Sequence, residues 1–472
     1  MDQPTTLSAR DIPAFLEDNA ITRVRVDGIQ PDALPIGKVL HPRKFLSSLD
    51  GDFAVADFVY GTDRMGEPGF GFSADWRSRV VGDIYLRPDL ATLRLDPAAA
   101  GLATCFADAL DVNRNRVPVC GRGLVKHLTE RLNGLGLTSK FAFEIEGHFF
   151  ERSFGENRAN GWTDMVPFGV DSHVAYLAQD HHRLDPVMTE ICRRLDLLGV
   201  PWEAWNAEAA AGQFELNVSP DDPLSASDHV IRVRQVCKEV AHERGLSVTF
   251  MAKVSEDYGN GLHVHHSLLE SDGLNTGEPV MYDPDGPDQI SLIARQWLAG
   301  LMATLPGSTS FMAPNPNSFR RVVPFKAVPT HATWDIDNKS SAIRVLNGSA
   351  SSARMEHRVG AGDLNPYFAA AIVLAGGIAG LEHELEPPPK FEFMAWGLPD
   401  TADSPARLPA SVVAAAEALE ADALLNDILG ADLVTYWTGM RRFEWLSFNT
   451  GGGDGASDAP NAWEINRYFE TL

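Results

Sequence analysis

The chain contains few cysteines, and they are widely spaced. Only four occur in 472 residues, at Cys105, Cys120, Cys192 and Cys237, and none forms a C-x-x-C pair. Cysteines this far apart are typical of reduced, buried thiols rather than of a disulfide framework. We therefore predict a cytoplasmic protein.

A basic leader and long hydrophobic runs are also absent. The longest apolar run, residues 367–381, contains two adjacent glycines and is shorter than the roughly 20 residues that span a bilayer. The opening residues, MDQPTTLSARD, have neither a positive start nor an apolar core. We expect residues 367–381 to form a buried helix, with no signal peptide and no membrane partner.

Positive charge is scarce. Lysine and arginine total 40 against 64 aspartates and glutamates, which gives a formal net charge of −24. Nucleic acids and anionic membranes attract basic surfaces, so this balance argues against both as partners. The hydrophobic fraction of 44% and the charged fraction of 22% are those of a soluble globular protein.

Helical and strand-like patterns alternate irregularly along the chain. Helical patterns fall at residues 122–132, 186–198, 227–243, 290–305, 364–384 and 411–424. The strands between them follow no regular βαβ rhythm, which favours an α+β fold. The Val117-Pro118 step separates a strand-rich region from the first helix, so we predict two domains, residues 1–117 and 118–472. His181-His182 is expected on a surface loop.

Several strand-like segments carry polar residues two positions apart. They are Glu144 and Glu146 in FAFEIE, His263, His265 and Ser267 in GLHVHHSL, and Glu356 and Arg358 in RMEHRV. Alternate side chains of a strand share a face, so each set points one way. His266 and His357 are expected to point the other way, into the core.

With Glu208 and Glu215 in AEAAAGQFEL, these segments offer six candidate metal ligands, five glutamates and His263. Any one such pair is more typical of an exposed strand face. Four segments together favour a common site, because carboxylates gathered inside a protein must bind protons or cations. Oxygen ligands with one imidazole suit Mg²⁺ or Mn²⁺.

In order and spacing, these segments resemble the glutamine synthetase superfamily. The matching motifs are E-x-E from Glu144, G-Q-F-E to Glu215, G-N-G-L-H-V-H-H-S to Ser267, N-S-F-R-R to Arg321, N-K-S-S-A-I-R to Arg344 and R-M-E-H-R to Arg358. The resemblance implies a small N-terminal β-grasp domain and a catalytic domain with a curved antiparallel sheet. It also implies a homo-oligomer of stacked rings, with a dodecamer favoured.

The resemblance further implies a role for each motif residue. Glu146, Glu208 and Glu215 would hold one metal ion, and Glu144, His263 and Glu356 a second. Gly259, Arg321 and Arg358 would bind L-glutamate, and His265, Ser267, Arg344 and Arg354 would bind ATP. Arg321, Lys339 and Arg344 are the implied catalytic residues, the last two meeting the transferred phosphate. The implied cofactors are ATP and Mg²⁺ or Mn²⁺.

Two segments depart from the pattern of ammonia-using members. Where those proteins have V-P-G-x-E-A-P, residues 323–329 read VPFKAVP, which puts Ala327 at the glutamate position. Their F-D-G-S-S motif has no match in residues 69–77, GFGFSADWR. The missing carboxylates would attract ammonium and accept its proton. The replacements favour a roomier pocket for an amine with a hydrocarbon body, and they are Phe70, Phe72, Trp76, Phe325 and Ala327.

We therefore predict a ligase that joins the γ-carboxylate of glutamate to an organic amine, with a hydrophobic alkyl- or arylamine favoured. Ammonia and polyamines or ethanolamine stay open as acceptors, since Asp57, Asp63 or Asp75 could supply a carboxylate. Tyr258 stands where the family has asparagine, which leaves the acyl substrate open too. A non-catalytic ring-forming relative is the remaining alternative, and the intact ligand set argues against it.

Overall fold

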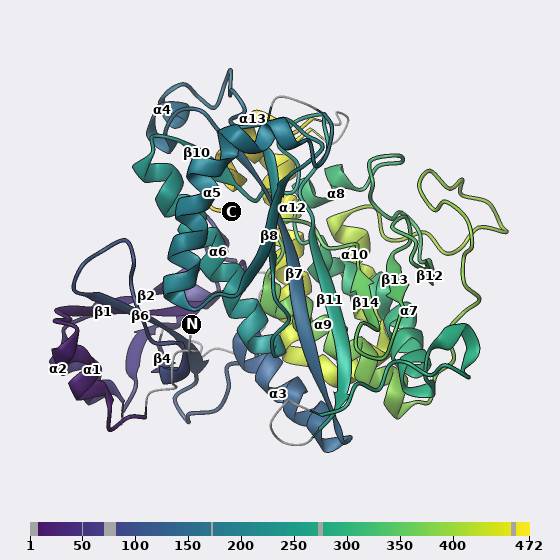
Figure 1. Ribbon diagram of the computed structural model, residues 1–472, viewed down its shortest axis with the longest axis horizontal. Helices are drawn as coiled ribbons and strands as arrows, with labels where there is room; N and C mark the ends of the chain where they lie inside the picture. Colours follow the sequence, from purple (N-terminus) through teal and green to yellow (C-terminus); the bar gives the residue numbers. More distant parts are fainter. Residues whose placement is uncertain (1–7, 50, 70–81, 171–172, 272–276, 455–458) are drawn as a thin grey trace.

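The protein is built around two β-sheets, as its computed structural model shows (Figure 1). The structure describes residues 8–49, 51–69, 82–170, 173–271, 277–454 and 459–472. The smaller sheet has the order β2-β1-β6-β4-β3, with β5 paired to β6. Its region comprises α1 (Ile12–Asp18), β1 (Arg23–Ile29), β2 (Pro35–Leu40), α2 (Pro42–Ser48), β3 (Phe53–Ala56), η1 (Asp57–Tyr60), β4 (Asp83–Pro88), η2 (Leu90–Thr92), β5 (Arg94–Leu95) and β6 (Leu102–Leu110).

The larger sheet is curved and mostly antiparallel, with the order β12-β13-β14-β11-β7-β9-β8 and β10 paired to β7. Among the described strands of this sheet, β12 and β13 are the one parallel pair. Its strands are β7 (Leu137–Phe150), β8 (Trp202–Ala207), β9 (Gln213–Val218), β10 (Ser247–Thr249), β11 (Leu262–Glu270), β12 (Trp334–Ile336), β13 (Ile343–Leu346) and β14 (Arg354–His357). The α+β prediction and the curved sheet are confirmed.

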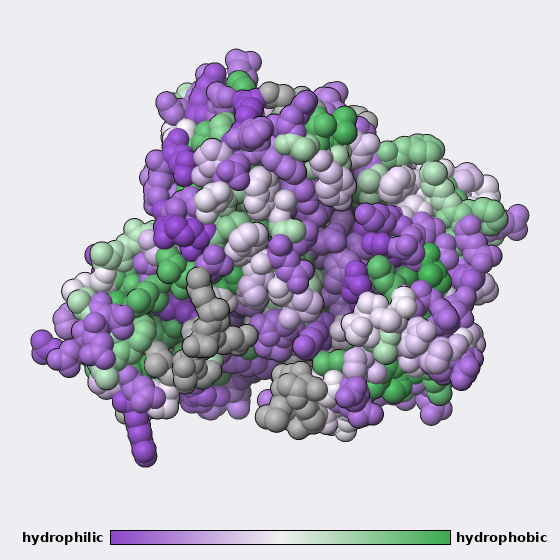
Figure 2. Space-filling view, in the orientation of Figure 1, coloured by the Kyte–Doolittle hydropathy of each residue, from purple (hydrophilic) through white to green (hydrophobic). Residues whose placement is uncertain are grey.

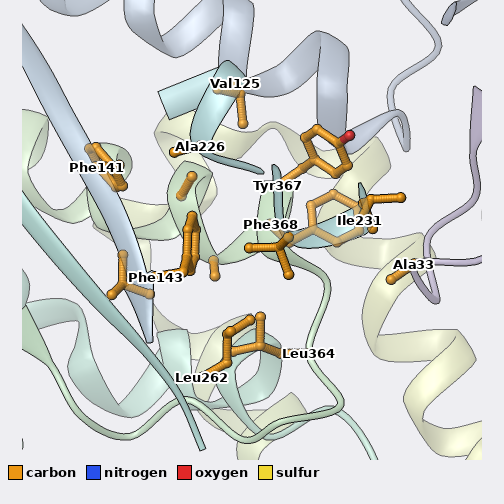
Figure 3. Close-up of a cluster of buried hydrophobic side chains, with 14 of the residues drawn as sticks. Ala33, Val125, Phe141, Phe143, Ala226, Ile231, Leu262, Leu364, Tyr367 and Phe368 are labelled. Atoms are coloured by element: carbon orange, nitrogen blue, oxygen red, sulfur yellow. The ribbon is translucent and has the colours of Figure 1, made fainter. Parts of the chain in front are cut away.

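Helices cover one face of the larger sheet and form the main core. They are α3 (Gly121–Gly134), α6 (Pro223–Glu243), α7 (Leu292–Met312) and α9 (Pro366–Glu382). Phe141 and Phe143 of β7 meet Tyr367 and Phe368 of α9 in this core (Figure 3). Residues of α9 are buried all round the helix, as expected of a helix without a polar face. The odd-numbered side chains of β7 thus face the core, and the even-numbered ones face the other way.

Close contact between α7 and α9 depends on glycine. A Cβ atom at Gly300 would lie 2.0 Å from the carbonyl oxygen of Gly376. A side chain at either position would separate the helices, so the glycines of the apolar run serve packing.

The remaining helices lie around this core. They are α4 (Phe154–Ala159), α5 (Ala178–Leu198), η3 (Pro287–Gln289), α8 (Pro316–Arg321), α10 (Val412–Ala421), α11 (Ala423–Leu429), α12 (Ala431–Thr450) and α13 (Ala462–Tyr468). The loop predicted at His181-His182 is wrong, because α5 begins at Ala178 and includes both residues. None of the helices in the described ranges combines the length and apolar character needed to cross a membrane.

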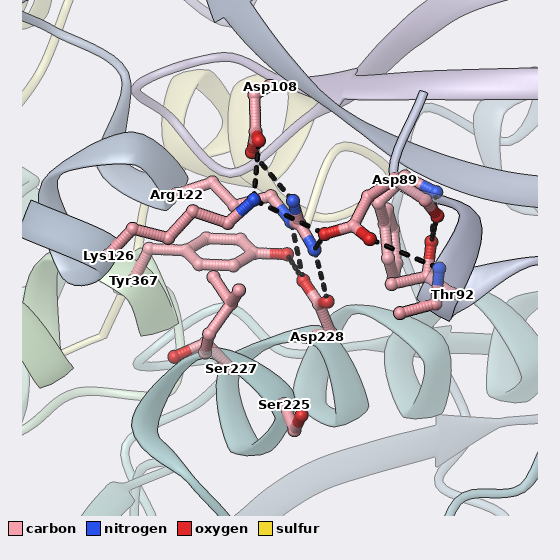
Figure 4. Close-up of polar contacts among 12 residues, drawn as sticks. Asp89, Thr92, Asp108, Arg122, Lys126, Ser225, Ser227, Asp228 and Tyr367 are labelled. Carbon is pink, nitrogen blue, oxygen red and sulfur yellow. Dashed lines mark hydrogen bonds and ion pairs between the residues drawn. The ribbon is translucent and has the colours of Figure 1, made fainter. Parts of the chain in front are cut away.

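A buried ion network joins the smaller sheet to the helices (Figure 4). Arg122 of α3 donates to Asp108 of β6 at 2.6 Å, to Asp89 at 2.8 Å and to Asp228 of α6 at 2.9 Å. Only 1% of the Arg122 side chain is exposed. Burial of a charge is tolerated when ion pairs and hydrogen bonds compensate it, and here one guanidinium meets three carboxylates.

Candidate active site

Strand pairing brings one group of predicted ligands together. Glu144 on β7 lies opposite His263 on β11, and Glu356 on β14 lies opposite His265. The Nδ1 atom of His263 is 3.0 Å from Glu144, and the Nε2 atom of His265 is 2.9 Å from it. Both histidines also approach Glu356, each at 3.8 Å. Glu144, His265 and Glu356 can place ligand atoms within 4.8 Å of one another, a spacing suited to a metal ion.

The two glutamates of this group are held in the ionised form. Burial opposes ionisation of Glu144, but hydrogen bonds from His263 and His265 outweigh it and keep its pKa below the usual range. Burial also opposes ionisation of Glu356, and the nearby Arg358 guanidinium lowers its pKa. The geometry therefore offers two anionic ligands beside imidazole.

A second group of carboxylates lies one strand away. Glu146 on β7 is opposite Glu215 on β9, and Glu208 follows the end of β8. Burial, reinforced by neighbouring glutamates, raises the pKa of Glu215 to about 9 and that of Glu208 to about 7. Such mutual repulsion is the electrostatic condition that a bound cation relieves.

Arginines complete the polar face. Arg321, at the end of α8, is 3.3 Å from His263 Nε2 and donates to the Val359 carbonyl oxygen at 3.2 Å. Burial lowers the Arg321 pKa to about 10, which leaves it a cation at neutral pH. Arg358 and Arg344 both donate to Glu356, the latter at 3.0 Å. These guanidinium groups can bind carboxylate or phosphate oxygens.

Gly259 allows the chain to pass close to Arg321. A Cβ atom there would lie 2.3 Å from the Ala252 carbonyl oxygen and 3.2 Å from the Arg321 side chain. Any larger residue would displace the loop that carries Tyr258.

Two adjoining cavities open over this face, where the surface is hollowed and hydrophilic (Figure 2). The narrower one, of about 300 Å³, is lined by Glu144, Glu146, Glu208, Glu215, Gly259, His263, Arg321, Lys339, Arg344 and Arg358. The wider one, of about 750 Å³, is lined by His265, Ser267, Arg354 and again Glu144. Glu356 is fully buried beneath them and bonded to two of the lining arginines. The predicted residues therefore meet in one region, although their individual roles stay predictions.

The structure describes two of the three aspartates that were suggested as binding groups for an amine. Asp63 is buried and bonded to Arg467, so it is not free to bind an amine. Asp57 is also buried. Asp75 lies outside the described residues, as do the predicted pocket residues Phe70, Phe72 and Trp76.

Sequence reasoning assigned no role to several residues that shape the cavities. Gln213 donates to Glu146 at 3.1 Å and to the Gly259 carbonyl oxygen at 3.2 Å. Its position in the G-Q-F-E motif was the sequence feature that could have identified Gln213 as a site residue. Tyr176 and Lys326 also line the narrower cavity. Burial and nearby glutamates raise the Tyr176 pKa to about 12, so it stays a neutral hydrogen-bonding group.

Known relatives agree with the motifs. A family model described as the glutamine synthetase catalytic domain matches residues 118–468. A glutamate–isopropylamine ligase of Pseudomonas sp is 28% identical over 469 residues, 99% of this chain and 98% of that protein. A gamma-glutamylethanolamide synthetase of Streptomyces coelicolor is 31% identical over 85% of this chain and 82% of its own length. A gamma-glutamylanilide synthase of Acinetobacter sp is 26% identical over 89% and 85%.

Solved structures agree with the fold. The ligand-free structure of GmaS matches with a TM-score of 0.81 and 24% identity, covering 98% of this chain and 99% of that one. Its ADP complex gives a TM-score of 0.80 and covers 97% and 98%. Since the family model spans well over half of the sequence, this chain belongs to the glutamine synthetase family and is a carbon–nitrogen ligase.

Proposed function

We propose that this ligase uses ATP to join glutamate to a hydrophobic alkyl- or arylamine, giving a γ-glutamyl amide. The observation that carries the proposal is that Ala327 and Val328 line the narrower cavity, alongside Arg321 and the glutamates. An ammonia user would need a carboxylate there to hold ammonium and accept its proton. The relatives named for isopropylamine, ethanolamide and anilide support an organic amine.

The carboxylate groups fit two divalent cations. Glu146, Glu208 and Glu215 would hold one Mg²⁺ or Mn²⁺, and the raised pKa values of Glu208 and Glu215 support this fit. Glu144, Glu356 and His263 would hold a second, with His265 as a competing ligand because it approaches Glu144 equally closely. Bound cations would neutralise charge on the phosphates of ATP.

The other side chains suit the two remaining substrates. Arg321 and Arg358 would bind the carboxylates of glutamate, for which a planar guanidinium is well shaped. The wider cavity has the volume of a cofactor site and would take ATP, with His265, Ser267 and Arg354 beside it. Lys339 and Arg344 line the narrower cavity, where the phosphate would be transferred.

The proposed reaction has two steps. A γ-carboxylate oxygen of glutamate attacks the terminal phosphorus of ATP, which releases ADP and forms an acyl phosphate. The amine nitrogen then attacks the acyl carbon, loses a proton and expels phosphate. Lys339 and Arg344 would stabilise the charge that develops on the phosphoryl oxygens, and the apolar wall at Ala327 would exclude water from the acyl phosphate.

The test is ADP release and amide formation, followed by mass spectrometry, with ATP, glutamate, Mg²⁺ or Mn²⁺ and one amine at a time. The amines are ammonium, ethylamine, isopropylamine, ethanolamine, putrescine and aniline. Stimulation by the hydrophobic amines well above that by ammonium is the expected result. Ammonium as the best acceptor would identify a glutamine synthetase instead. If every amine fails, the proposed reaction is contradicted, and the acyl substrate, which Tyr258 leaves open, is the first part of it to test again.

The assembly and domain division are also proposed. We place the domain boundary at residue 118, where the match to the family model begins. Because the chain belongs to this family, we also expect a cytoplasmic homo-oligomer of stacked rings, with a dodecamer favoured. Light scattering on the purified chain measures its mass directly. A monomer would contradict this assembly.

A further inference from the structure

Two residues that line the narrower cavity, Tyr258 and Lys326, contact each other. Tyr258 stands at an asparagine position, and Lys326 precedes Ala327 in the loop between α8 and β12. The Lys326 ammonium lies 5.2 Å from the centroid of the Tyr258 ring. Both side chains line the cavity together with Ala327 and Val328. The two side chains therefore form a single feature of one wall, which we name the Lys326–Tyr258 pair.

The charge of Lys326 is not offset by a carboxylate. Within the ranges that the structure describes, its ammonium contacts the Tyr258 ring face but forms no salt bridge. Arg344 and Arg358 of the same cavity differ, because both are bonded to Glu356. An aromatic face attracts a cation without neutralising it, so this wall of the cavity stays positive.

We propose that the Lys326–Tyr258 pair is a charge filter that accepts monoamines and rejects diamines and polyamines. The inference rests on the proposed function and specifies its substrate class. In a cavity of about 300 Å³, a second ammonium group on the acceptor cannot avoid the field of Lys326. A hydrocarbon chain or ring meets Tyr258 and Val328 instead, at no electrostatic cost.

The glutamates of the cavity would attract a diamine, and this effect opposes the filter. Glu356 is already paired with two arginines, and Glu144 with two histidines. The remaining glutamates of the cavity, Glu146, Glu208 and Glu215, would be neutralised in the loaded enzyme by the metal ion that they are proposed to hold. Lys326 therefore provides the uncompensated charge on the amine's side of the cavity.

The experiment compares two acceptors of equal chain length, pentylamine and 1,4-diaminobutane, by amide formation in the presence of ATP, glutamate and Mg²⁺. Lys326→Met keeps an unbranched side chain, shorter by one atom, and removes its charge. We expect this variant to raise kcat/KM for the diamine about tenfold more than kcat/KM for pentylamine, through KM. Lys326→Glu should favour the diamine further.

Two controls separate charge from structure. Lys44→Met removes the same charge from an exposed position on α2 and should leave the preference unchanged. Added salt should narrow the preference of the natural protein but not that of Lys326→Met, because salt screens the filter.

The outcomes separate this inference from the proposed function. Normal monoamine turnover with the same preference in both Lys326 variants would overturn the filter and leave the ligase function intact. Equal loss of kcat for both amines would give Lys326 a role in the chemistry and also overturn the filter. Failure of the natural protein with pentylamine as well as with the diamine would overturn both the filter and the proposed function.

Discussion

At the scale of single residues, Ala327 carries the prediction about ammonia. Its φ of +59° places it in a turn that already accommodates an L residue with a side chain, so a glutamate adds little further backbone strain. We expect Ala327→Glu to increase ammonium-dependent ADP release by about tenfold, because a carboxylate would attract ammonium and accept its proton. Ala327→Gln has the same shape without the charge and should not. Equal behaviour of the two variants would contradict the proposed acceptor site.

A second prediction for a single residue concerns Glu144, which contacts both His263 and His265. Glu144→Gln removes the negative charge with little change in volume, so we expect at least a hundredfold loss of activity, on the order of 3 kcal/mol in the barrier. Raising Mn²⁺ should partly restore it if the loss arises from weaker metal binding. Titration of ADP release against Mn²⁺ measures this, with the exposed Glu130→Gln on α3 as the unaffected control.

The sequence was sufficient to predict on which face of its strand each candidate site residue lies. The period of two placed Glu144 and Glu146 on one face and His266 in the core, where its ring packs against Phe141 and Trp297. The contact between His265 and Glu144 could not be predicted, because it depends on the pairing of two strands far apart in the chain. Lys326 was overlooked as a functional residue for a related reason, since its partner Tyr258 is distant in sequence.

At the scale of elements, three adjacent strands each carry a fully buried histidine. Burial lowers the pKa of His148 on β7 to about 4, that of His266 on β11 to about 3 and that of His357 on β14 to about 4. In the unfolded chain a histidine has a pKa near ~6.5. Between pH 6.5 and 4 the unfolded chain therefore binds more protons than the folded one, and the free energy of unfolding decreases as the pH falls.

Each of these histidines should cost on the order of 1 kcal/mol per pH unit across that window, while stability above pH 6.5 is unaffected by them. Urea unfolding at pH 7, 6 and 5, followed by circular dichroism, measures the slope. His266→Leu should make it shallower, whereas the exposed His383→Leu should not. Identical slopes in all three proteins would show that His266 binds its proton equally well in the folded and unfolded chains, which contradicts the lowered pKa.

Helix α5 shows the limit of prediction for elements. Its pattern was placed at residues 186–198, because a proline more often begins a helix than lies inside one. The structure starts the helix at Ala178 and keeps Pro186 in the interior. Burial of Asp180 and Leu184 anchors the first two turns, and this tertiary contact is not visible in the local sequence. Helices α3, α6 and α9 lie close to the predicted positions, whereas α7 continues to Met312, beyond the predicted end at residue 305. The pattern at residues 411–424 is divided between α10 and α11, and α12 was not predicted.

At the scale of the whole molecule, the Arg122 network holds the smaller sheet against the helices. Arg122→Met would leave Asp89, Asp108 and Asp228 without their shared cation, so we expect about 3–5 kcal/mol less stability. Chemical denaturation measures the change. Arg131→Met, on the same helix, breaks an ion pair with Glu382 that is about a third exposed and should cost less than about 1 kcal/mol. Similar losses for both would refute a special role for Arg122.

The contacts between residues far apart in the chain could not be predicted from the sequence. Asp63 and Arg467 lie 404 positions apart yet form a buried ion pair that ties the segment after η1 to α13. Composition and motifs suggest two regions and one common site, but they say nothing about which distant charges meet. Side-chain burial decides those partners, and it is a property of the folded chain alone.

The alternation of faces on β7, β11 and β14 has a consequence for evolutionary divergence. Each strand carries a polar site residue next to a core residue, as in Glu144 and Ile145. A single inserted residue would exchange the two faces, so catalysis and folding would be lost in one event. The segment at residues 322–333 belongs to no strand. Acceptor preference can therefore drift by point substitution in this loop among descendants that share an unaltered catalytic sheet.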